Sequence, residues 1–90
     1  MSAKELAAKY IAAMEKTLGE TRRTSASVIA NEECINEIFG YVKAYLGDAK
    51  YFLSHDKFET SLVSIAYCEG LLDALKLIGA VDVSPFEKKH

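Results

Sequence analysis

The segment from residue 58 to residue 78, FETSLVSIAYCEGLLDALKLI, is more apolar than the outer helix of a small bundle. On a helical wheel its hydrophobic side chains cover about half of the circumference, whereas an ordinary surface helix carries a stripe of roughly 100°. These side chains are Val63, Ile65, Tyr67, Cys68, Leu71, Leu72, Leu75 and Ile78. The segment therefore predicts a central helix covered on most sides, with a strip of Glu69, Asp73 and Lys76 facing water.

Two further helices are predicted before this segment. Ser2 and Glu5 form a capping-box pair, which predicts a helix over residues 3–18. A heptad pattern of apolar residues then predicts a long helix over about residues 27–54, with Asn31 as its one polar seam position. Both helices have an apolar stripe that must be buried, so we expect them to pack around the central helix.

The connection Ser54–Lys57 is short, so the second and third helices are predicted to form an antiparallel hairpin. Asp56 and Glu59 form a second capping pair, which predicts a third helix over residues 57–78. The sequence thus predicts one all-α domain over residues 1–90. We expect a three-helix antiparallel bundle with a long central hairpin and a short C-terminal tail.

Composition excludes several classes of protein. The net charge is -2, with 11 basic and 13 acidic residues, so no overall basic field attracts nucleic acid or an anionic membrane. No run approaches the ~18 uninterrupted apolar residues of a membrane span, and the N-terminus does not resemble a signal peptide. Cys34 and Cys68 lack metal-binding spacing and are expected to be reduced and packed. We therefore expect a cytoplasmic protein that binds neither membrane nor nucleic acid.

The polar stretch over residues 20–27 is predicted to be a loop. Arg22 and Arg23 within it could hold a phosphate group. An isolated pair of arginines in a loop is more often simply solvated, and both interpretations remain open from the sequence.

Three acidic residues offer one candidate site. Glu69 and Asp73 lie four residues apart, so their carboxylates point the same way from the third helix. If Asp48 joined them across the hairpin, three carboxylates would suit a hard cation such as magnesium. No histidine accompanies them, and an ion pair between Asp73 and Lys76 is the simpler interpretation.

A second candidate is the stripe of small residues Ala66, Gly70 and Ala74. A glycine inside a helix is tolerated where something approaches the backbone closely. The expected occupant is another helix, from the same chain or from a second copy. A planar ligand is the alternative, and the tyrosines that could line its pocket are Tyr41, Tyr45, Tyr51 and Tyr67.

Residues 45–79 combine several short motifs in an unusual order. The motifs are Tyr45, Asp48-Ala49, Tyr51-Phe52, Asp56-x-Phe58 and Tyr67-x-Glu69-Gly70-Leu71-Leu72-Asp73-Ala74, closed by Gly79. They resemble the signature of an archaeal family known as domain of unknown function number 357. The resemblance covers the second half of the chain well and the first half loosely. It implies a small helical domain, in some members next to or fused with a nucleotidyltransferase-like domain, and it implies no catalytic residue.

The chain has no Gly-rich phosphate loop, nucleophile elbow or zinc spacing, so we expect neither an enzyme nor a cofactor. The excess of apolar helix surface predicts instead a non-catalytic module that binds a partner protein or a second copy. The alternative is binding of a small molecule, nucleotide or divalent metal at a carboxylate and tyrosine cluster on the hairpin. The candidate ligand or interface residues are Tyr45, Asp48, Tyr67, Glu69, Gly70 and Asp73.

Overall fold

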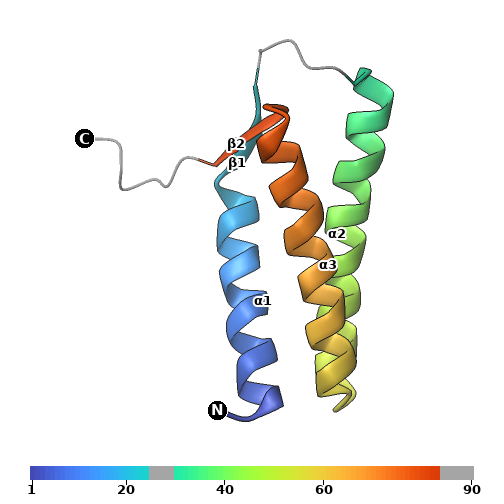
Figure 1. Cartoon of the computed structure of the whole chain (residues 1–90). Coiled ribbons are helices and arrows are strands. Elements are labelled where there is room, and N and C mark those ends of the chain that lie inside the picture. Colours follow the sequence, from blue (N-terminus) through green and yellow to red (C-terminus); the bar gives the residue numbers. More distant parts are fainter. Residues whose placement is uncertain (25–29, 84–90) are drawn as a thin grey trace, which may run out of the picture.

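A computed structural model describes residues 1–24 and 30–83 of the chain. In chain order the elements are α1 (Ala3–Gly19), β1 (Thr21–Arg23), α2 (Glu32–Ser54), α3 (Phe58–Leu77) and β2 (Val81–Val83). The helices run up, down and up, and α3 lies between α1 and α2 (Figure 1). The predicted all-α bundle with its α2–α3 hairpin is therefore confirmed.

The first helix begins as predicted. The Ser2 hydroxyl accepts a hydrogen bond from the Glu5 amide at 3.1 Å, and the Ser2 amide donates to the Glu5 carboxylate at 2.9 Å. These bonds to Ser2 lower the pKa of the Glu5 carboxyl, because they stabilise its ionised form. The capping box thus satisfies amides that the first turn of α1 leaves without a helical partner.

The core lies where the three helices meet, and each helix contributes one stripe to it. Its helical members are Ala7, Ile11 and Met14 of α1, Ile35, Val42, Leu46 and Ala49 of α2, and Ser61, Ser64, Ile65, Cys68, Leu72 and Leu75 of α3. Ala80 and Val81 are buried at one end of the bundle. Steps of three and four residues along α3 place its buried residues on a single face.

Two buried hydrogen bonds fix the register of the hairpin. The Ser61 hydroxyl donates to the Ala49 carbonyl at 2.7 Å, and the Cys68 thiol donates to the Val42 carbonyl at 3.2 Å. Between the two bonds, α2 and α3 each advance by the same number of residues in opposite directions. The helices therefore stay in step, and any α3 residue can be matched to its level on α2.

The second helix begins at Glu32 and not at about residue 27. The Asn31 side chain is its N-cap and accepts a hydrogen bond from the Cys34 amide at 2.7 Å. Asparagine is among the strongest N-caps, so the helix starts there although the heptad pattern extends further. The interpretation of Asn31 as a seam residue was therefore wrong, and residues 25–29 lie outside the described part of the chain.

The hairpin turn uses Asp56 to end α2. Its φ is 61°, and the Lys57 amide donates to the Phe52 carbonyl at 2.8 Å while the Asp56 amide donates to the Leu53 carbonyl at 3.2 Å. This pair of bonds is a Schellman motif with Asp56 at its left-handed position. The predicted capping pair with Glu59 is not formed, because α3 has Lys57 at its N-cap position without a side-chain bond.

A small antiparallel sheet was not predicted. Thr21 pairs with Val83 and Arg23 with Val81, so part of the predicted loop at residues 20–27 is strand β1. Val81 is buried and Val83 half-buried, so this part of the C-terminal tail lies against the bundle. The rest of the tail, including Phe86, lies outside the described residues.

The Arg23 side chain fastens this sheet to α2. Its Nε donates to the Ala80 carbonyl at 3.3 Å. Its two terminal nitrogens reach the Asn36 amide oxygen at 2.9 Å and the Glu32 carboxylate at 3.0 Å. Arg22 forms an ion pair with Asp82 on β2 at 3.6 Å. Both arginines therefore take part in contacts that close this end of the bundle.

Within the described residues, none of the helices combines the length and hydrophobicity that crossing a lipid bilayer requires.

Candidate functional site

The side of α3 that faces away from the core is apolar, as is the side that faces the core. Val63 is 57% exposed, Tyr67 59% and Leu77 87%, and Ile78 just beyond the helix is also exposed. The prediction that Val63, Tyr67 and Ile78 are covered was wrong. The buried stripe includes Ser61 and Ser64, which a count of hydrophobic residues passes over. Because Ser61 and Ser64 are part of the buried face of α3, that face points away from Val63 and Tyr67.

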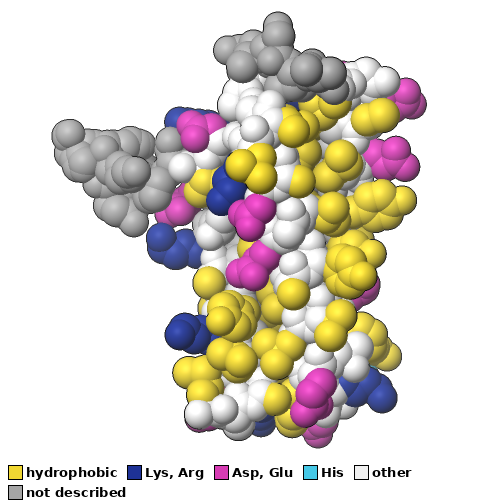
Figure 2. Space-filling view, in the orientation of Figure 1, with side chains coloured by type: hydrophobic (Ala, Val, Ile, Leu, Met, Phe, Trp, Pro, Cys, Tyr) yellow, Lys and Arg dark blue, Asp and Glu magenta, His cyan; other side chains and the backbone are white. Residues whose placement is uncertain are grey.

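An open groove runs along this outward side. It is lined by Val63, Ala66, Tyr67, Gly70 and Leu71, which together are called the α3 surface below. Figure 2 shows hydrophobic side chains gathered along this face of the molecule, over α3 and the border of α2. The α3 surface is thus continuous with further exposed apolar area.

Gly70 lies open at the centre of the α3 surface. A Cβ built on it would meet no atom within 4 Å among the described residues. The Ala66 and Ala74 side chains are also exposed. Within residues 1–24 and 30–83, no helix of the chain occupies the small-residue stripe. Of the two occupants expected from the sequence, a helix of the same chain is therefore not found there, and a helix of a second copy stays a prediction.

Tyrosines border the α3 surface on the side of α2. The rings of Tyr45 and Tyr67 stack with their centroids 5.3 Å apart and an interplanar angle of 18°. Tyr45 is half-buried, and Tyr41 nearby in sequence is exposed. Two of the tyrosines predicted to line a site thus do come together, and Tyr67 belongs to both the stack and the groove.

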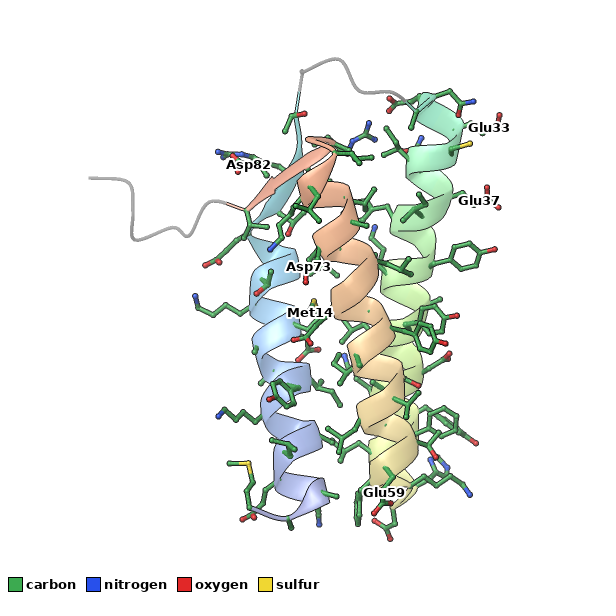
Figure 3. The ribbon with its side chains drawn as sticks, in the orientation of Figure 1. Met14, Glu33, Glu37, Glu59, Asp73 and Asp82 are labelled. Atoms are coloured by element: carbon green, nitrogen blue, oxygen red, sulfur yellow. The ribbon has the colours of Figure 1, made fainter. Side chains whose placement is uncertain are left out.

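Acidic residues border the α3 surface on the side of α1. Asp73 projects between α1 and α3, on the side where Met14 is labelled (Figure 3). Its carboxylate lies 3.2 Å from the Lys76 ammonium group, so the predicted ion pair is confirmed. Glu69 lies one turn before Asp73 and is half-buried.

Asp48 does not join these two carboxylates. The hairpin register matches Asp48 to the level of Leu62 on α3. Seven residues of helix separate that level from Glu69, which is about 10 Å along the axis. Among residues 1–24 and 30–83, no three His, Cys, Asp or Glu side chains are grouped so that they could hold a metal ion. The proposed three-carboxylate arrangement is therefore not present in the described part.

The cysteine and histidine side chains of the described residues lie outside the α3 surface. Burial raises the pKa of the Cys68 thiol to about 11, and the charge of Glu69 adds to the shift. Cys34 is also free but exposed, contrary to the expectation that both cysteines are packed. The His55 ring stacks on Tyr51 with centroids 4.1 Å apart at the end of α2. A buried neutral thiol is a poor nucleophile, so Cys68 acts here as a core residue.

The small-residue stripe was the sequence signal that located the α3 surface, although the side chains beside it were expected to be covered.

A family model described as "Protein of unknown function (DUF357)" matches residues 9–81, from within α1 to the start of β2. The resemblance first noted for residues 45–79 thus extends over most of the chain. Comparison with curated proteins and with solved structures finds no match. Because the family model covers most of its length, the chain belongs to the DUF357 family.

Proposed function

We propose that this chain is a non-catalytic protein-interaction module that binds its partner through the α3 surface. The observation that carries the proposal is an exposed apolar face on the helix that also forms the centre of the core. Large contiguous apolar patches on a folded domain are typical of interaction sites, especially where polar residues border them. The tyrosines on one side and the acids on the other give the α3 surface such borders.

The shape of the α3 surface favours a helix as the bound element. Gly70 and its two neighbouring alanines leave the α3 backbone accessible between the larger side chains of Val63 and Tyr67. A ridge of side chains on a second helix fits such a groove, because residues four apart form ridges and grooves on both helices. Recognition of an amphipathic helix by an apolar groove is a recurring mode of protein binding.

A small aromatic molecule is the second candidate ligand. The observation that favours it is the Tyr45–Tyr67 stack beside the groove, since Tyr67 is exposed and could stack on a planar ring such as a nucleobase. A panel of nucleotides and divalent cations, measured by thermal shift, separates the two functions. If the chain binds only proteins, none of these compounds should raise its melting temperature.

Gly70→Leu provides the direct test of the α3 surface. The new Cβ meets no described atom within 4 Å, so the fold should be kept, and the rest of the side chain should occupy the open groove. Gly47→Leu is the matched control, because Gly47 is also exposed and open but lies on the polar side of α2. Amphipathic peptides of about 20 residues, selected from a display library for binding to the unaltered protein, are the probe.

The expected result is a set of peptides that bind the unaltered protein and Gly47→Leu but not Gly70→Leu. Circular dichroism checks that both variants are folded. If no peptide depends on Gly70 and the protein also does not self-associate through this face, the proposal is overturned. A nucleotide that stabilises the protein but not Gly70→Leu would favour the second candidate.

A further inference from the structure

Most of the charged residues of α3 are acidic. Within the helix, Glu59, Glu69 and Asp73 are acidic, and Lys76 is the one basic residue. The Lys76 ammonium group is held at 3.2 Å from Asp73, so it offsets one of these acids at the border of the α3 surface. Glu59 and Asp73 are exposed and Glu69 is half-buried, which leaves a net negative charge along the helix.

Acidic residues of α2 lie away from the groove. Lys50 contacts Glu15 of α1 at 2.7 Å, which places this lysine on the α1 side of α2. Glu33 and Glu37 project away from α1 (Figure 3). The hairpin register matches Glu37 to the level of Asp73 and Glu33 to the level of Leu77, beyond the residues that line the groove. The acidic border of the α3 surface is therefore formed by Glu69 and Asp73 of α3 itself.

We infer that the α3 surface binds one amphipathic helix of another protein, with small and apolar residues along its contact stripe and Lys or Arg along one edge of it. The inference rests on the proposed function and names the kind of partner. Basic side chains along one edge of a bound helix would face Glu69 and Asp73 at the acidic border of the groove, and such complementarity selects partners and speeds their association. Their long aliphatic stems would also cover exposed apolar area beside the groove.

The same charges argue against a second copy as the occupant. A two-fold dimer uses the same patch on both copies. Pairing the α3 surface with itself would bring Glu59, Glu69 and Asp73 of both copies to one interface, with Lys76 as the only α3 cation to offset them. One face of a helix about 30 Å long also provides far less than the ~800 Å² per partner of a standard interface. The area fits a weak complex with a single helix better than a stable dimer.

The test uses the selected peptides and two charge variants. Lys and Arg are expected to be enriched at the border positions of peptides whose binding depends on Gly70. Glu69→Gln combined with Asp73→Asn should weaken these peptides roughly five-fold, and high salt should weaken their binding to the unaltered protein similarly. Glu33→Gln is the matched control, since it removes one acid at the distant first turn of α2 and should leave the affinity nearly unchanged.

Sedimentation velocity over a range of concentrations completes the experiment, and a monomer is expected throughout. Peptides that need Gly70 but carry neutral or acidic borders would overturn the inference and leave the proposed function standing. A dimer that Gly70→Leu dissociates would do the same, because the occupant would then be a second copy. A monomer that binds no Gly70-dependent peptide would overturn both.

Discussion

The Ser61 hydroxyl donates a hydrogen bond to the backbone carbonyl of Ala49 at 2.7 Å, across the α2–α3 hairpin and with both residues fully buried. A hydrogen bond of this kind contributes about 1 kcal/mol to the free energy of unfolding. Ser61→Ala should therefore lower that free energy by about 1 kcal/mol, measured by urea unfolding. Thr60→Ala, at the exposed neighbouring position, should change it by less than about 0.5 kcal/mol. Equal effects at both positions would show that the buried bond has no special role.

Gly70→Ala should stabilise the protein by up to about 1 kcal/mol, because alanine favours a helix over glycine and the new methyl group meets open space. Gly47→Ala on α2 should have a similar effect for the same reason. Thermal unfolding of dilute protein compares the two. Loss of stability at Gly70 alone would mean that another chain already covers the α3 surface in solution.

Gly79→Ala should destabilise the protein by about 1 kcal/mol. Gly79 has a φ of 80°, and the motif that ends α3 includes a 2.9 Å bond from the Ala80 amide to the Leu75 carbonyl. An alanine side chain is strained in this left-handed conformation. Urea unfolding should show the loss, and a neutral result would indicate that the end of α3 rearranges without strain.

Asp56→Gly should have the opposite effect. Asp56 occupies in α2 the position that Gly79 occupies in α3, with a φ of 61°. Glycine removes the strain of the left-handed conformation but adds freedom to the unfolded chain, so we expect a net gain of roughly 0.5 kcal/mol. The same urea measurement checks it. A loss of stability would show that the Asp56 side chain itself supports the turn.

The Cys68 thiol should make the protein less stable in alkaline solution. The pKa is raised from 9.0 to about 11 by burial, so between these values the unfolded chain loses a proton that the folded chain keeps. Stability from this group is complete below pH 9 and declines as the pH rises toward 11. Cys68→Ala should reduce the slope of the decline in urea unfolding, whereas Cys34→Ala should not. Equal slopes in both variants would assign the decline to other groups.

Local signals in the sequence predicted local structure well. The capping box at Ser2 and the short hairpin connection both act within a few residues, and each is present in the structure. The start of α2 was missed because a favourable N-cap at Asn31 competes with a heptad pattern that continues on both sides. Likewise, Asp56 could cap the start of α3 or end α2 in a left-handed conformation. The structure has it in the second role, with a positive φ.

Features that depend on distant residues were harder to predict. Strand β1 exists because Thr21 to Arg23 meet Val81 to Val83, and neither segment has a strong strand signal by itself. The orientation of α3 depends on Ser61, whose burial is favourable only because the Ala49 carbonyl is there to accept its hydrogen bond. The α3 surface was therefore located by its glycine, while the exposure of Val63 and Tyr67 was not foreseen.

Leu71 is packed against the core and also lines the groove, whereas the fully buried residues of α3 and the other groove residues occupy different positions of the helix. If the α3 surface binds a partner as proposed, selection for folding and selection for recognition act on largely separate positions of the same helix. During evolution, substitutions in the groove can change which molecule is recognised while the scaffold is inherited intact. A designer could likewise graft new specificities onto this helix without redesigning the bundle.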